Sequence, residues 1–166
     1  MKYHPRRDNH SQLVELKAPS KPTPSASWND LNQIATVIPD GPVPTSLNGI
    51  TLAAWTEAPT KPSGWEDLAS RHPQAFTEPP MVSNPGKSAA SGVVILEGDG
   101  RVWVVSPSNA FGGYVNTFPK GKIDRGLSLR ANALKECHEE SGLQVELTVS
   151  ARQSHLDRVT RSCFWV

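Results

Sequence analysis

The sequence predicts an α/β domain in the C-terminal half of the chain. Two β-branched runs, Gly92–Leu96 and Val102–Val105, flank the segment 97–100, whose Gly and Asp-Gly residues accept positive φ and so predict a hairpin. The segment 129–141 has the period of an amphipathic helix. The alternation of apolar and polar residues over 143–149 predicts a further strand.

Three parts of the chain differ in composition. Residues 1–27 are polar and dense in Pro, Ser and Lys from 17 to 27, which predicts a disordered or linker-like arm. Residues 28–87 hold many prolines, which disfavour long helices and central strands, but also apolar anchors such as Trp28. They predict an irregular N-terminal extension that packs onto the following domain. Residues 88–166 form the domain itself.

The extension still contains local sequence patterns that predict short helices and a short strand. Residues 28–38 predict a short helix, and 48–55 predict a turn followed by a short strand. A helix is expected over 64–72, with Pro73 as its stop. Trp55 and Trp65 are expected to pack against the domain.

Within the domain, residues 114–118 predict a short strand that Pro119 ends. Ser128 is the expected N-cap of the helix over 129–141, and Gly142 its C′ residue. Residues 150–166 show no period of two, and a short helix around Leu156 is the expectation.

The helix carries three glutamates on one narrow face. Glu136, Glu139 and Glu140 are spaced i, i+3 and i+4, so their carboxylates crowd together. A solvated acidic face is one explanation. The other is a hard divalent cation such as Mg²⁺ or Mn²⁺, which would turn the repulsion into coordination. Cys137 and His138 are expected on the packed side of the helix.

The net charge, the apolar runs and the cysteine count exclude several classes of function. A net charge of +1 gives no electrostatic case for nucleic acid or an anionic membrane surface. No apolar run reaches membrane-spanning length, and the N-terminus lacks the apolar region of a secretory signal. The two cysteines form no disulfide or metal pattern, which agrees with a cytoplasmic protein. The sequence leaves open whether the protein forms a homodimer.

The stretch 121–143, GKIDRGLSLRANALKECHEESGL, resembles the Nudix box, G-x5-E-x7-R-E-U-x-E-E-x-G-U, where U is aliphatic. Gly121, the three glutamates, Gly142 and Leu143 match their positions, and Cys137 stands at an aliphatic one. The preceding hairpin and the Phe-Pro-Lys-Gly lead-in are also similar to this family. The resemblance covers roughly residues 88–150.

The resemblance implies a Nudix-type α/β/α sandwich with a mixed sheet. It also implies Mg²⁺- or Mn²⁺-dependent hydrolysis of the diphosphate linkage in a nucleoside diphosphate derivative. By carry-over, Glu136, Glu139 and Glu140 would be catalytic and would bind the metal, with the Gly121 carbonyl as a further ligand and Glu136 as candidate base. Lys120 and Lys122 would meet substrate phosphate oxygens, the alternative being ordinary surface lysines.

Two signature positions depart from the pattern. Leu127 replaces the first glutamate, and Lys135 replaces the arginine. Only a short segment follows the box, so we expect a C-terminally truncated domain whose tail after about Leu147 leaves the parental reading frame. These departures keep two alternatives open: a catalytically inactive Nudix-fold module that binds nucleotide or protein, and a truncated non-functional product.

Overall fold

The structure, a computed structural model, describes eight segments of the chain. They are residues 2–3, 11–13, 15–16, 22–38, 41–72, 88–106, 116–156 and 159–165. Only the backbone is described for the strand residues 2–3, 15–16, 149–156 and 159–165. The described chain falls into two compact units, one formed by residues 1–53 and 106–117 and the other by residues 54–105 and 118–166.

The first unit holds only short elements. Strands β1 (Lys2–Tyr3) and β2 (Glu15–Leu16) pair antiparallel, as do β3 (Ser46–Leu47) and β4 (Ile50–Thr51). The β3–β4 hairpin confirms the turn and short strand expected within 48–55. The 3₁₀ helix η1 spans Ser25–Asn29.

The prediction of a helix over 28–38 was wrong. After η1 the backbone leaves helical geometry at Asp30, whose carboxylate accepts hydrogen bonds from Asn32 N (2.9 Å) and Gln33 Nε2 (2.7 Å). An aspartate that bonds the backbone two residues on offers the chain a turn in place of a helix.

A five-stranded mixed sheet forms the centre of the second unit. The order is β6 (Val102–Trp103), β5 (Ser88–Leu96), β9 (Val159–Trp165) and β8 (Val149–Leu156), and β7 (Lys120–Lys122) also pairs with β5. Only β5 and β9 run parallel; the other pairs are antiparallel. The expected hairpin is confirmed, with Leu96 opposite Val102.

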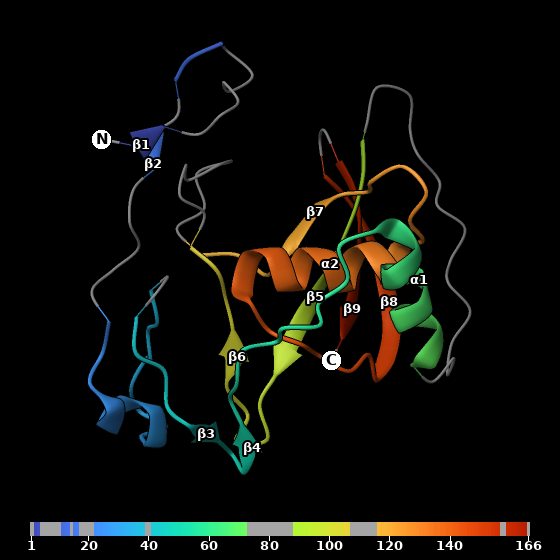
Figure 1. Cartoon of the computed structure of the whole chain (residues 1–166). Helices are drawn as coiled ribbons and strands as arrows, with labels where there is room; N and C mark the ends of the chain where they lie inside the picture. The colour runs from blue at the N-terminus through green and yellow to red at the C-terminus, as the bar shows by residue number, and fades with distance from the viewer. Residues whose placement is uncertain are drawn as a thin grey trace. The chain divides into compact units, whose positions relative to one another are not determined.

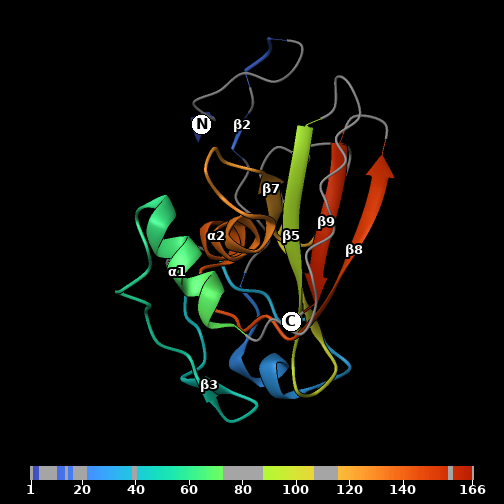
Figure 2. The ribbon, with the colours of Figure 1, turned by 90° about the vertical axis from the view of Figure 1, so that its right-hand side faces the viewer.

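Two helices lie on the same side of this sheet, as Figure 2 shows. Helix α2 (Leu129–Ser141) crosses β5, and α1 (Pro62–Arg71) packs beside α2 (Figure 1). The helix expected over 64–72 is therefore confirmed, while Pro73 lies outside the described residues. Among the described residues of this unit, no helix covers the other face, so the second helical layer of the expected sandwich is not part of what is seen.

The core fills the space between the helices and the sheet. It is built from alternate β5 residues, the packed side of both helices and Leu147. Its fully buried members include Val93, Ala131, Ala133 and Cys137, the last as expected. Trp65 is 4% exposed and anchors α1 in this core, with Trp55 against it.

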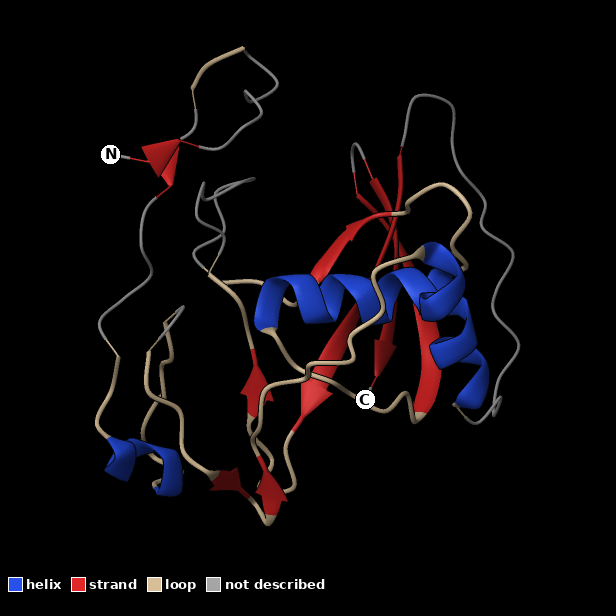
Figure 3. Ribbon diagram, viewed as in Figure 1, coloured by secondary structure: helices blue, strands red, loops and turns tan. Residues whose placement is uncertain are grey.

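Three predictions of secondary structure in the C-terminal half of the chain need correction. The strand expected at 114–118 is not seen in its described part, 116–118, and the strand instead lies at Lys120–Lys122. Residues 143–148 alternate in burial as expected but form no ladder. The tail around Leu156, expected to be helical, forms the β8–β9 pair drawn as strands in Figure 3.

The missing ladder at 143–148 has a physical cause. Side chains, not a neighbouring strand, satisfy two of its backbone donors: Leu143 N donates to Ser141 Oγ (3.2 Å) and Leu147 N donates to His72 Nδ1 (3.1 Å). The segment is extended and places its apolar residues in the core without joining the sheet.

Candidate metal-dependent active site

The acidic face belongs to a helix whose two ends are capped as predicted. Ser128 Oγ accepts a hydrogen bond from Ala131 N (3.2 Å), and Gly142 adopts φ 74° while its N–H donates to the His138 carbonyl. The left-handed conformation favours glycine because a Cβ would clash there. These caps fix the register of α2, and so the direction of its three glutamates.

Glu136 lies directly against β7. A Cβ placed on Gly121 would overlap the Glu136 carboxylate, so the absent side chain is what lets the carboxylate approach the strand backbone. Strand β7 holds Gly121 opposite Ser91 of β5. The first glycine of the predicted box and its first matching glutamate are thus in contact.

The Glu136 carboxylate is only 13% exposed and accepts no hydrogen bond from the described residues. Burial raises its pKa from 4.5 to about 7. Lys135 lowers the pKa, while Glu139, Glu140 and Asp124 raise it further. Its negative charge is therefore poorly compensated by the protein.

Glu140 reaches the same strand through its carboxylate, which accepts a hydrogen bond from Lys120 N at 2.9 Å. Burial raises the pKa of Glu140, and both this hydrogen bond and the Lys120 ammonium oppose the rise. Glu136 and Glu140 therefore meet consecutive residues of β7, one by close packing and one by a hydrogen bond.

The Lys135 ammonium lies among the carboxylates of the acidic face and Asp124. Its Nζ lies 2.6 Å from Glu139 Oε2, 3.1 Å from Asp124 Oδ2 and 3.8 Å from Glu136 Oε1. Burial disfavours the ammonium, but the hydrogen bonds to Glu139 and Asp124 outweigh it and raise the pKa of Lys135. Lysine at the position of the signature arginine thus still bonds the acidic face, as a point charge shared among three carboxylates.

The two lysines expected to bind substrate are placed differently from the glutamates. Residues adjacent in a strand point to opposite faces, so Lys120 and Lys122 flank Gly121 on the side away from Glu136. Lys122 is exposed, and Lys120 Nζ donates to the Phe118 carbonyl at 3.3 Å. The Lys120 backbone N–H bonds Glu140 of the acidic face directly, and the Lys120 ammonium acts on Glu140 through its charge.

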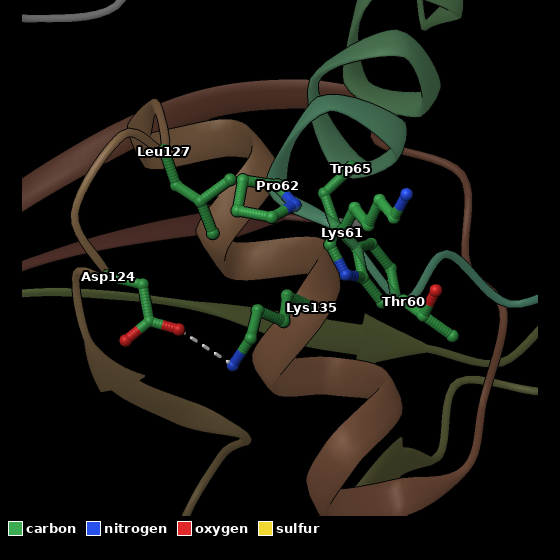
Figure 4. Close-up of a pocket in the computed structure, with 7 residues that line it drawn as sticks. All are labelled: Thr60, Lys61, Pro62, Trp65, Asp124, Leu127 and Lys135. Atoms are coloured by element: carbon green, nitrogen blue, oxygen red, sulfur yellow. Dashed lines mark ion pairs between the residues drawn. The ribbon is translucent and has the colours of Figure 1, made fainter.

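Leu127, at the position of the signature's first glutamate, lies between the two helices. It lines a pocket of about 220 Å³ together with Pro62 and Trp65 of α1 (Figure 4). Asp124 and Lys135 form the polar wall of this pocket, joined by the ion pair drawn there. The leucine is half-buried against the core and makes an apolar contact where the signature has an acid.

Sequence reasoning missed two residues that hold this region. Asn132, fully buried, accepts a hydrogen bond from Asp124 N (3.0 Å) and donates one to Ser91 Oγ (3.0 Å). Glu66 of α1 accepts hydrogen bonds from Ser128 N and Ser128 Oγ. A polar residue among alanines in mid-helix was a signal for Asn132. For Glu66 the sequence offered none, because 62 positions separate the partners.

His138 lies on the packed side of α2, as expected. Its ring centroid is 5.0 Å from that of Trp55 and 5.9 Å from that of Trp65. The histidine is thus part of an aromatic cluster that joins α2 to the segment before β5, and it takes no part in the acidic face.

The carboxylates of the acidic face suit a divalent cation in their chemistry but not in their present arrangement. Within the described ranges, no three His, Cys, Asp or Glu side chains are arranged to hold a metal ion. The donors nevertheless suit Mg²⁺ or Mn²⁺, because all are carboxylate oxygens and Glu136 carries a buried charge with no hydrogen-bond donor. The set fits in chemistry, and Glu139 and Glu140 would exchange their present protein partners for the ion.

Two comparisons with known proteins bear on this site. Residues 86–165 match the family model described as NUDIX domain. The match continues to residue 165. The expectation of a truncated domain whose tail leaves the parental reading frame after about Leu147 stays a prediction. No curated protein matches the chain. Among the described residues, no helix is long and apolar enough to cross a membrane.

Proposed function

Because residues 86–165 belong to the Nudix family, we propose that this chain is a hydrolase that cleaves the diphosphate linkage of a nucleoside diphosphate derivative, with Mg²⁺ or Mn²⁺ as cofactor. The observation that carries the proposal is the placement of Glu136 and Glu140 against consecutive residues of β7, with the Glu136 charge only partly compensated by Lys135.

Each residue of the acidic face receives a role in this proposal. Glu136, Glu139 and Glu140 would hold the ion through carboxylate oxygens, together with the Gly121 carbonyl. A divalent ion at this position supplies neutralisation of diphosphate charge and polarisation of water. Glu136, with a pKa of about 7, is suited to accept a proton at neutral pH.

Lys135 keeps the acidic face assembled before any ion binds. Its ammonium bonds Glu139 and Asp124 and lies near Glu136, which offsets the repulsion among these carboxylates. Lys120 and Lys122 remain candidates for substrate phosphates that approach from the strand side. Trp28 and the other residues of the first unit have no assigned role.

A hydrolysis assay over a substrate panel tests the proposal. The panel contains nucleotide sugars, dinucleotides and nucleoside triphosphates, each with and without Mg²⁺. Glu139→Gln and Glu140→Gln are expected to lower Mg²⁺-dependent turnover by at least about tenfold, since each removes a charged ligand. Glu146→Gln is the matched control, because Glu146 is exposed and lies just beyond the helix. Undiminished turnover in both variants would refute the assignment of the metal ligands.

One observation favours a second candidate, a catalytically inactive Nudix-fold module that binds nucleotide or protein. The Lys135 ammonium already occupies a position among three carboxylates, as a metal ion would. If the ammonium replaces the ion, Lys135→Met should create Mn²⁺ binding that the parent lacks. If the chain is an enzyme, the parent binds Mn²⁺ and Lys135→Met turns over less substrate.

A further inference from the structure

We propose that Glu66 of α1 is a positioning residue for the acidic face. It holds the first turn of α2, and thereby keeps Glu136 and Glu140 in register with β7. Glu66 lies outside the segment that matches the family model, which begins at residue 86. The effect of Glu66 on turnover rests on the proposed function, whereas its effect on the alignment of α2 with β7 does not.

The contact is bidentate and completes the helix cap. Glu66 Oε1 accepts a hydrogen bond from Ser128 N, and Oε2 accepts one from Ser128 Oγ at 3.0 Å. Ser128 Oγ in turn accepts from Ala131 N. One carboxylate therefore fixes both the backbone and the side chain of the N-cap, and places negative charge at the positive end of the helix.

The loop that Glu66 holds connects β7 directly to α2. At its start, Asp124 N donates to Asn132 Oδ1 (3.0 Å), and Asn132 is itself bonded to Ser91 of β5. At its end, Ser128 is bonded to Glu66. The loop is thus fastened at both ends, once by the helix it enters and once by α1.

Small displacements of α2 would matter for the acidic face. A shift of one residue along a helix moves each side chain by about 1.5 Å. Metal–ligand distances are held to within about 0.2 Å. The contacts of Glu136 with Gly121 and of Glu140 with Lys120 N both depend on this alignment of α2 with β7.

Glu66 is itself held firmly. Its neighbour Trp65 and the nearby Ala69 are each 4% exposed and belong to the core cluster that contains Leu129 and Leu134 of α2. The carboxylate therefore extends from a buried anchor, and Leu127, the residue before Ser128, lines a pocket together with Pro62 and Trp65 of α1. Helix α1 acts as a brace on the first turn of α2.

Three variants test the inference in the full-length chain. Glu66→Ala removes both hydrogen bonds. Glu66→Gln keeps an acceptor for Ser128 N and a donor for Ser128 Oγ, and so serves as the conservative rescue. Asp67→Ala is the matched control, since Asp67 is exposed on the same helix and its loss changes the net charge equally.

The first measurement is the amide hydrogen exchange of Lys120, whose N–H reports directly on the Glu140 contact. We expect exchange about tenfold faster in Glu66→Ala, and within about threefold of the parent in Glu66→Gln and Asp67→Ala. If the alanine variant unfolds, Glu66→Asp replaces it, because its shorter side chain cannot reach both Ser128 atoms. Exchange of Lys120 that stays at the parental rate would overturn the inference.

The second measurement is Mn²⁺ affinity, with kcat and KM where turnover exists. Glu66→Ala should lose about tenfold in Mn²⁺ affinity and in kcat, with KM less affected, and glutamine should restore both. A variant that loses only thermal stability, with Lys120 exchange and Mn²⁺ affinity unchanged, would show a plain structural cap and refute positioning. A parent chain that neither binds Mn²⁺ nor turns over substrate contradicts the proposed function alone, because the exchange experiment still decides the role of Glu66.

Discussion

Replacing Glu136 by glutamine should stabilise the chain at alkaline pH when no divalent ion is present. The carboxylate is 13% exposed, and its pKa rises from 4.5 to about 7 on folding. Between these values the folded state holds a proton that the unfolded chain has released. The free energy of unfolding therefore falls as pH rises from about 4.5 to 7, and this contribution stays constant above that.

The size of the effect follows from the shift. At 1.36 kcal/mol per pKa unit, the change from 4.5 to about 7 corresponds to roughly 3 kcal/mol between the two protonation states. Glutamine is isosteric and uncharged, so it removes the penalty of burying the charge. We expect Glu136→Gln to exceed the parent by about 2–3 kcal/mol at pH 8 and to equal it near pH 4.5.

Urea unfolding in EDTA at several pH values measures this difference, with Glu146→Gln as the exposed control. Adding Mg²⁺ at pH 8 should raise the stability of the parent more than that of Glu136→Gln, because the variant keeps only two of the three carboxylates that would hold the ion. A glutamine variant no more stable than the parent at pH 8 without divalent ions would refute the argument that Glu136 is a buried, poorly compensated acid.

Three further outcomes are expected. Gly121→Ala should cost about 1–3 kcal/mol in urea unfolding and abolish Mg²⁺-dependent turnover, because its Cβ overlaps the Glu136 carboxylate. Asn132→Ala should cost about 2–4 kcal/mol, because Asp124 N and Ser91 Oγ lose their shared partner; a cost below about 0.5 kcal/mol would contradict this. Burial lowers the pKa of folded His72 below 6.5, so the unfolded chain takes up the proton first and stability falls as pH drops below 6.5. This slope, measured in the Glu136→Gln background, should flatten with His72→Gln.

The sequence predicted best where structure depends on neighbouring residues. Helix α2 begins after Ser128 and ends before Gly142 as expected, because a hydroxyl cap and a left-handed glycine act within one turn. The prediction of the β5–β6 hairpin likewise depended only on the turn residues between two neighbouring strands. By contrast, β7 is Lys-Gly-Lys and has no strand propensity of its own; it is a strand because Ser88–Leu96 offers it a partner.

The strands β8 and β9 show the same limit at the end of the chain. Residues 150–166 lack a period of two, and β8 contains a register irregularity between Val149 and Arg152. Strand β9 is paired on both sides, with β5 in parallel and β8 antiparallel. The parallel pairing with β5 comes from distant residues, so the local sequence pattern gave no warning of it.

For the site, spacing along one helix was sufficient to identify the three glutamates, but their partners come from elsewhere. Glu140 bonds Lys120 N, 20 positions away, and Gly121 makes room for Glu136. Strand alternation places the side chains of Lys120 and Lys122 on the face of β7 opposite Glu136, and the sequence did not predict a strand at these residues.

The two departures from the signature gain a common explanation once α1 is included. Leu127 packs against the core and lines a pocket together with Pro62 and Trp65 of α1. The next residue, Ser128, is bonded by Glu66 of the same helix. The loop thus takes its support from α1 rather than from an acid of its own. Lysine at 135 still pairs with Glu139 and reaches Asp124 in that loop. If this reasoning holds, Leu127→Glu in the parent should weaken the packing of α1 and improve Mn²⁺ affinity little, whereas Glu66→Ala should lower it.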